Sequence, residues 1–338
     1  MLERILKYFF ILLLATHLIG IGLWLSWLRA DLHRIRVIPE EERVFVIPQG
    51  ATLSDVLKDL RQSGLAPEPA FVRLFIGLSG EKIVVKKGEY QLPPEASTRQ
   101  ILTLFNEGRV VLLKLTIPEG LDKWETAEVL AEHSWGDLET FQKLIDDPKP
   151  ILDLDPKAKN LEGYLFPETY LFPREAKPEE IIEAITDLFR ERTKSLRAEL
   201  GKRGLTVREW VALASLVEKE TSIPEERTRI AGVFENRLNK GWLLQCDPTI
   251  VYSLKLNDRY RGKIYKSDIK YQSPYNTYVS KGLPPGPIAN PGMAALAAAM
   301  NPEETPYFYF VAQADGSHYF SKTLKEHNRA VRRYRSGR

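Results

Sequence analysis

The chain has 338 residues, a length that allows two domains. Its 48 Lys and Arg residues and 45 Asp and Glu residues give a net charge of +3, and this near balance argues against nucleic acid as a partner. Cys246 is the only cysteine, which excludes an intramolecular disulfide and a cysteine-rich metal site. We expect neither a metal nor another cofactor.

The first predicted element is a transmembrane helix over residues 8–28, which carries no charge other than a possible one on His17. At 1.5 Å per residue this stretch spans roughly 31 Å, about the thickness of the hydrocarbon core of a bilayer. Trp24 and Trp27 lie at its far end, where indole rings favour the headgroup level. No A-x-A-like cleavage site follows, so we predict a membrane anchor and not a removed signal peptide.

The charges beside this helix leave its orientation open. Arg4 and Lys7 precede it, and Arg29, Arg34 and Arg36 follow it. A long domain translocates largely regardless of such charges, so the count does not decide which side holds the rest of the chain.

A small βααβ module is predicted over residues 44–110, after a short polar linker over residues 29–43. Thr52 and Asp55, and later Ser97 and Gln100, have the spacing of a capping box, which marks the start of a helix. The predicted elements are strands at 44–47, 84–85 and 90–92 and helices from 52, over 69–78 and from 97.

A larger and mostly helical domain is predicted over residues 111–338, giving an α+β chain overall. Residues 252–291 are rich in Tyr, Pro, Asn and Gly and are expected to form an ordered, functional loop region. The predicted helices cover 122–133, 140–147, 178–200, 206–221, 225–240 and 324–334, and a hairpin joins 307–311 to 317–321.

The helix over residues 206–221 suggests where chemistry takes place, since the chain has no phosphate-binding glycine loop and no serine hydrolase, zinc protease or dinucleotide motif. Trp210, Leu213 and Val217 form an apolar stripe, and the next position on that stripe is Glu220. Burial of this carboxyl at a helix C-terminus would raise its pKa, as a general acid requires.

Two less specific interpretations apply to the same helix end. Glu220 could lie in water at a frayed terminus, or pair with Arg227 or Arg229. Glu218 lies on a different line of the helix, below Val211, and a milder environment is expected for it.

Several sequence blocks follow one another along the chain in a recognisable order. The blocks are Glu162–Tyr170, Glu218-Lys-Glu-Thr221, Arg229–Leu238, Leu244-Gln-Cys-Asp-Pro-Thr249 with Tyr252, Tyr275-Asn-Thr-Tyr278, Gly282–Ile288 and His327-Asn328. Together they resemble the endolytic murein transglycosylases of the MltG (YceG-like) family. Their ordered co-occurrence makes the resemblance specific, and Cys246 is a small departure where Thr or Ser is expected.

This resemblance implies a LysM-like module from residue 44 and, beyond it, a catalytic domain of lysozyme and transglycosylase character. It implies that Glu220 is the catalytic residue, with Glu218 and Thr221 as possible auxiliary residues. Such enzymes cut the β-1,4 bond between MurNAc and GlcNAc without water, and leave a 1,6-anhydro-MurNAc end. One carboxyl group then serves as acid and afterwards as base.

The loop blocks supply candidate substrate-binding residues, because amide and phenol groups suit sugar hydroxyls and N-acetyl groups. These candidates are Gln245, Asp247, Tyr275, Asn276 and Tyr278. Bracing of the loops is the alternative role for them. For Glu162 and Glu168 we expect a structural role, as buried partners of backbone or arginine groups.

Two other functions remain open. A hydrolytic muramidase would use Asp247 as its second carboxylate, and a scaffold tethered to the membrane would bind the wall without catalysis. The resemblance implies peptidoglycan glycan strands as substrate and peptidoglycan synthases as partners. Because peptidoglycan lies outside the cytoplasmic membrane, it also implies that residues 1–7 are cytoplasmic and that the domains are not.

Overall fold

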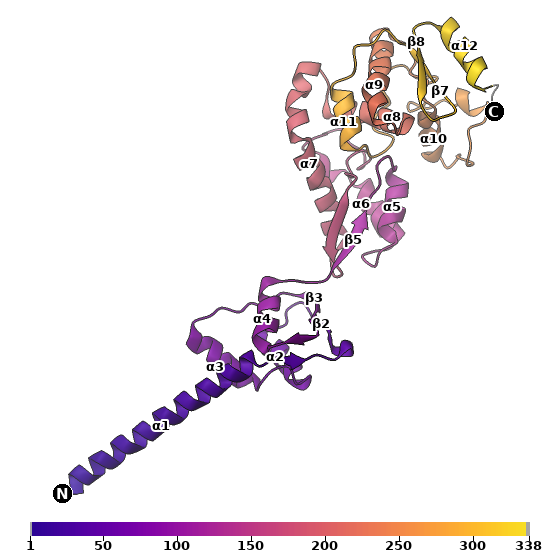
Figure 1. The fold of residues 1–338 in the computed structure, drawn as a ribbon. Helices are drawn as coiled ribbons and strands as arrows, with labels where there is room; N and C mark the ends of the chain where they lie inside the picture. The colour runs from indigo at the N-terminus through magenta and orange to yellow at the C-terminus, as the bar shows by residue number, and fades with distance from the viewer. Residues whose placement is uncertain (1, 336–338) are drawn as a thin grey trace. The chain divides into compact units, whose positions relative to one another are not determined.

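The computed structural model describes residues 2–335 and has a mostly helical α+β fold (Figure 1). The chain forms two compact units. The first contains the residues up to Leu113 together with Leu171–Glu175, and the second contains Lys114–Tyr170 and the residues from Ala176 onward. The LysM-like and lysozyme-like character expected for the two parts stays a prediction.

Helix α1 (Leu2–His33) is long and apolar enough to cross a membrane, as an anchor or as a signal sequence would. Its apolar side chains are exposed over most of its length. The last turns differ, because Leu28 and Leu32 are buried in the core of the first unit.

The rest of the first unit confirms the predicted βααβ order. Strand β2 (Val44–Ile47) pairs in antiparallel register with β3 (Gly88–Gln91), and both predicted capping boxes are formed. Between and after these strands lie α2 (Leu53–Gln62), α3 (Pro69–Ser79) and α4 (Thr98–Glu107). Their inner faces, with Leu57, Val72 and Phe105, make the core.

Two predictions for this unit are wrong. Residues 29–43 are not a linker, because β1 (Arg36–Val37) pairs with β4 (Glu95–Ala96) and Ile38 is fully buried. A short 3-10 helix, η1 (Glu40–Glu42), follows β1. The strand expected at 84–85 is absent from the described structure, since residues 81–87 are irregular and only β3 pairs with β2.

The second unit is built around the buried helix α8 (Val207–Glu220), which packs against α9 (Pro224–Asn239) and α11 (Met293–Met300) (Figure 1). The predicted helices and the C-terminal hairpin are confirmed within a few residues. Its other elements are α5 (Lys123–Ala131), α6 (Leu138–Asp146), η2 (Lys149–Ile151), α7 (Pro178–Arg203), α10 (Asp247–Lys255), η3 (Asp268–Lys270), β7 (Tyr309–Ala312), β8 (His318–Ser321) and α12 (Leu324–Arg335). Strands β5 (Leu112–Thr116) and β6 (Thr169–Pro173) each have residues in both units.

The region from 252 to 291 is ordered as expected, but helix α10 extends into it as far as Lys255. Helix α11 was not predicted at all. Its sequence, Met-Ala-Ala-Leu-Ala-Ala-Ala-Met, is apolar at every position, so it has no polar face from which a helical period could be recognised.

Candidate active site

Helix α8 places the candidate catalytic carboxyl, and its start is fixed by a capping box. The Thr206 N–H donates to Glu209 Oε2 at 2.9 Å, and the Glu209 N–H donates to Thr206 Oγ1 at 3.2 Å. All residues from Trp210 to Val217 are buried. The helix therefore runs through the core and presents its last residue, Glu220, at the end of the buried segment.

Glu220 lines a cleft of about 380 Å³. The walls come from the end of α9, the loop before α10, the hairpin of β7 and β8, and helix α12. The cleft is lined by Glu220, Arg237, Leu244, Gln245, Asp247, Tyr278, Tyr309, Phe310, Val311, Ala312, His318, Leu324, His327, Asn328 and Val331. Segments distant in sequence thus converge on one carboxyl group.

The pKa of Glu220 is raised above its usual value, first because burial disfavours the charged form and further because Asp247 is near. The Cys246 thiol hydrogen-bonds the carboxyl, and this bond acts in the opposite direction, as do His318 and Arg237. Cys246 thus keeps a hydrogen-bond donor where the family resemblance suggests a hydroxyl residue. The net effect is a raised pKa, which favours the protonated form that a general acid needs.

Gln245 and Asp247 lie on either side of Cys246 and both reach the cleft. Gln245 has a φ of 55°, in the left-handed region, and its Oε1 accepts a hydrogen bond from Arg237 Nη1 at 3.3 Å. Asp247 opens α10, and its Oδ1 accepts from the Tyr278 hydroxyl. The structure therefore brings Gln245, Asp247 and Tyr278 to the cleft of Glu220, and their binding of substrate stays a prediction.

Arg237 was not recognised from the sequence as a site residue, although it lies in a block that carries the family resemblance. Its guanidinium donates to the backbone oxygens of Phe308 at 2.6 Å and Leu244 at 2.8 Å. Burial lowers its pKa from the usual arginine value. Arg237 thus ties the loop before α10 to the hairpin strand and places a cation at the cleft wall.

His318 and Glu226 form a second feature that sequence reasoning missed. Nδ1–H of His318 donates to Glu226 Oε2 at 2.7 Å, and the His318 N–H donates to Oε1 at 2.8 Å. Thr221, directly after Glu220, donates its hydroxyl to the same carboxylate at 3.3 Å. A spacing rule could not find this pair, because 92 positions separate its members.

The expectation of a milder environment for Glu218 is wrong. Its side chain is only 6% exposed, lies 3.6 Å from Arg227 and accepts the Gly292 N–H at 3.0 Å. The reason is that α8 is covered on this side as well, by α9 and by the segment that leads into α11. Burial raises the pKa of Glu218 too, but Glu218 is not among the residues that line the cleft.

Asn276 and Tyr275 are not among the residues that line the cleft. Full burial makes the binding role expected for Asn276 wrong, whereas that of Tyr275 stays a prediction. Asn276 is 0% exposed, and its amide binds the backbone of its own loop, donating to Tyr271 O at 2.8 Å and accepting from the Tyr278 N–H at 3.0 Å. Tyr275 packs on Tyr252, with ring centroids 5.0 Å apart, and lines a separate hollow with Glu162. Asn276 thus braces the loop that carries Tyr278.

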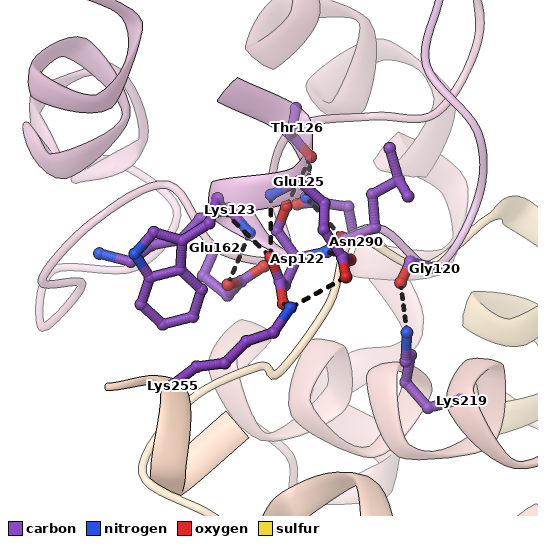
Figure 2. Close-up of polar contacts among 11 residues, drawn as sticks. Gly120, Asp122, Lys123, Glu125, Thr126, Glu162, Lys219, Lys255 and Asn290 are labelled. Carbon is purple, nitrogen blue, oxygen red and sulfur yellow. Dashed lines mark hydrogen bonds and ion pairs between the residues drawn. The ribbon is translucent and has the colours of Figure 1, made fainter. Parts of the chain in front are cut away.

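A further hollow of about 360 Å³ adjoins the cleft, because Asp247 lines both. Figure 2 shows the polar groups at one side of it. Lys255 bridges Asp122 and Glu125, with 2.9 Å from Nζ to Glu125 Oε1. Lys219 donates to the Gly120 oxygen at 2.9 Å.

Glu162 lies beside these polar groups and, as expected, is a buried partner of a backbone group. It accepts the Lys123 N–H at 3.0 Å (Figure 2). Burial raises its pKa to about 8. Glu168 differs from the expectation in being exposed, although it does pair with Arg192 at 3.5 Å.

Residues 2–335 contain no group of three or more His, Cys, Asp or Glu side chains arranged to hold a metal ion.

Comparison with known proteins gives consistent matches over most of the chain. The model of the YceG-like family matches residues 45–333. A Bacillus subtilis (strain 168) protein named endolytic murein transglycosylase is 31% identical over 309 residues, which cover 86% of this chain and 84% of the relative. A Streptococcus pneumoniae (strain D39) protein of the same name is 29% identical, and the match covers 84% of this chain and 57% of that relative.

A solved structure also matches. The crystal structure of a YceG-like protein from Listeria monocytogenes is 33% identical, with a TM-score of 0.59 over 85% of this chain and 98% of that one. The chain belongs to the YceG-like family.

Proposed function

We propose that this protein is an endolytic peptidoglycan lytic transglycosylase and that Glu220 is its catalytic acid and base. The observation that carries the proposal is a carboxyl group of raised pKa, at the end of a buried helix, that opens into a polar cleft. The Bacillus and Streptococcus relatives are named for this activity, and both alignments cover more than four fifths of the chain.

In the proposed reaction Glu220 gives its proton to the oxygen that links C1 of MurNAc to C4 of GlcNAc. The C1–O bond breaks, and the C6 hydroxyl of the same MurNAc attacks C1. The proton of that hydroxyl returns to Glu220, now a carboxylate, and the new C1–O6 bond closes the 1,6-anhydro ring. A single carboxyl suffices, since the nucleophile belongs to the substrate and needs no activated water.

The residues around Glu220 suit both halves of this cycle. Burial and Asp247 favour the protonated acid, whereas His318, Arg237 and the Cys246 thiol favour the carboxylate that remains after proton transfer. The net result of these effects is a raised pKa, which favours the protonated acid that the first step needs.

For substrate binding we propose Gln245, Asp247 and Tyr278, which line the cleft with Glu220. The neighbouring hollow shares Asp247 and has Tyr252 and Tyr260 in its wall. It would take further sugars of the strand, as an enzyme that cuts inside a polymer requires.

We further propose that residues 8–28 anchor the protein in the bacterial cytoplasmic membrane, with residues 1–7 inside and the chain from residue 29 onward outside. Residues 44–110 would act as a LysM-like module, and residues 111–338 as the catalytic domain. An anchor this close to the module keeps the enzyme beside the membrane, where new strands emerge. Peptidoglycan synthases are the partners expected there, and cleavage would end strand elongation.

A hydrolytic muramidase is the second candidate function. Asp247 favours it, because this exposed carboxylate lies in the cleft of Glu220, and hydrolysis uses two carboxyl groups. Asp247 would then activate a water molecule or bind the sugar covalently.

Mass spectrometry of peptidoglycan digested by the purified full chain tests the proposal. We expect internal cleavage products that end in 1,6-anhydro-MurNAc. Products that end in reducing MurNAc would contradict it and would establish the muramidase. An inactive protein whose Glu220→Gln variant still supports normal growth would favour a non-catalytic scaffold tethered to the membrane.

A further inference from the structure

Helix α3 (Pro69–Ser79) has apolar side chains on two sides, of which the core covers only one. Val72 and Ile76 point into the core of the first unit. Phe71, Leu74 and Leu78 are 42%, 50% and 65% exposed. At 3.6 residues per turn these three fall within about 60° of one another, so they form one outward face. A contiguous exposed apolar face of this kind marks an interaction site.

This outward face is continuous with the apolar surface of α1. The indole ring of Trp24 meets the ring of Phe71 edge-on, with centroids 5.3 Å apart. On α1, Leu23 and Trp27 beside this contact are exposed as well. The exposed apolar side chains of α1 and α3 therefore form one continuous surface, and no charged residue lies between them where the two helices touch.

The contact lies at the depth where the anchor would leave the bilayer. Lys7 and Trp24 are 17 residues apart, which in a helix amounts to about 26 Å. Trp24 is therefore near the far boundary of a hydrocarbon core of about 30 Å, the level that tryptophan favours. Phe71, in contact with Trp24, would lie at the same level.

The polar groups of α3 and its neighbours point elsewhere. Arg73 donates through Nη1 to Ser54 Oγ at 2.8 Å, on α2. Glu68, just before α3, faces Arg61 at 3.8 Å. The outward face itself presents only Phe71, Leu74 and Leu78, without a group that would select a particular protein partner.

We propose that α3 lies in the boundary between headgroups and acyl chains of the bilayer, with Phe71, Leu74 and Leu78 inserted among the lipids. The inference rests on the proposed membrane anchor at residues 8–28. Helices that lie in this boundary bury an apolar face about 5–10 Å deep. This second point of attachment holds the first unit against the membrane surface.

Site-specific fluorescence in liposomes tests this placement with the full chain. Three variants, Leu78→Cys, Gln62→Cys and Leu14→Cys, are labelled with an environment-sensitive dye and reconstituted in phosphatidylcholine–phosphatidylglycerol vesicles. Gln62 is an exposed polar position on α2, and Leu14 lies within α1. Cys246 is buried, and the unsubstituted chain controls for labelling there.

We expect the dye at position 78 to be quenched by lipids that carry a nitroxide near the headgroup, at least about threefold more than the dye at position 62. Iodide in the aqueous phase should quench the dye at position 62 more strongly than the dye at position 78.

Equal quenching by iodide at 78 and 62, with the dye at position 14 in lipid, would overturn the inference and leave the anchor intact. A dye at position 14 in water would instead refute the anchor. Shielding of position 78 only in native membranes, and not in protein-free vesicles, would overturn the lipid assignment in favour of a protein partner.

Discussion

His318 binds the Glu226 carboxylate twice, through its backbone N–H at 2.8 Å and through Nδ1 at 2.7 Å. A carboxylate only accepts hydrogen bonds, so Nδ1 carries the proton and the orientation of the ring is fixed. Because His318 also lines the cleft of Glu220, this pair joins the hairpin strand β8 to the start of α9 beside the C-terminal end of α8.

Replacement of His318 by Gln should change the pH profile of the enzyme. His318 favours the carboxylate form of Glu220, so its loss should raise the pKa of Glu220 further. The alkaline fall in kcat/KM, which reports loss of the proton from the free acid, should then move to higher pH. We also expect kcat to fall about tenfold, or about 1.4 kcal/mol in the barrier.

The measurement is kcat/KM on purified glycan strands between pH 5 and 9. Glu226→Gln should give the same shift with a smaller amplitude, because the imidazole remains but loses its fixed orientation. His133→Gln is the matched control, since His133 hydrogen-bonds Val129 and Lys114 and is not a cleft residue. Identical profiles for His318→Gln and His133→Gln would refute the role of His318.

Asp247→Asn should shift the same profile in the opposite direction. Asp247 raises the pKa of Glu220, so removal of its charge should move the alkaline limb to lower pH. A transglycosylase needs no second carboxylate, and we expect it to keep its anhydro products with a loss of activity below about tenfold. A muramidase that uses Asp247 as its second carboxylate would lose about 10²-fold or more. Mass spectrometry of the products beside the pH profile separates the two outcomes.

The position of Glu220 could be predicted because it depends on local rules. The capping box at Thr206 and Glu209 fixes where α8 begins, and helical periodicity then carries the apolar stripe to its end. The same reasoning gave the wrong environment for Glu218. A single helix sequence does not reveal whether its neighbours cover one side or all sides, and α8 is covered on all sides.

The other parts of the cleft depend on contacts between distant segments. Asn276 and Tyr278 stand two residues apart in one loop, yet one is sealed inside it and the other reaches Asp247. The loop closes around Asn276, and no periodic pattern encodes this. His318 and Glu226 were not recognised for a similar reason, since their pairing exists only after the hairpin has packed against α9.

A comparison of Glu220→Gln with Glu218→Gln should separate chemistry from folding. Glutamine at 220 cannot donate the acidic proton, so we expect a loss of kcat of at least about 10²-fold with little change in Tm. Glutamine at 218 removes the charge that faces Arg227 inside the fold, so Tm should fall while the remaining folded protein keeps its cleavage activity. On the same samples, calorimetry gives the Tm and an assay of strand cleavage gives kcat. Substantial activity in Glu220→Gln would assign the acid to another group.

Glu162 should make the second unit less stable as pH rises. Its pKa is about 8 in the folded protein against the usual 4.5, so the folded state binds a proton more tightly than the unfolded state does. The stability that this proton provides is complete below about pH 4.5 and is lost as pH rises towards 8. Between pH 5 and 8 the loss should be on the order of 3 kcal/mol, or roughly 6 to 12 °C in Tm.

Glu162→Gln should remove most of this dependence, because glutamine resembles the protonated acid in shape and carries no charge to bury. The control is Glu209→Gln. The pKa of Glu209 is lowered by its hydrogen bonds with Thr206, so this residue is ionised in both folded and unfolded states above about pH 5. Replacement of the Glu209 carboxylate should therefore lower Tm by a similar amount at pH 5 and at pH 8.

Calorimetric scans of the full chain in detergent at these two pH values would show how the pH dependence of Tm differs between the two variants. An unchanged pH dependence of Tm in Glu162→Gln would mean that another buried group, such as Glu218 with its raised pKa, dominates the titration.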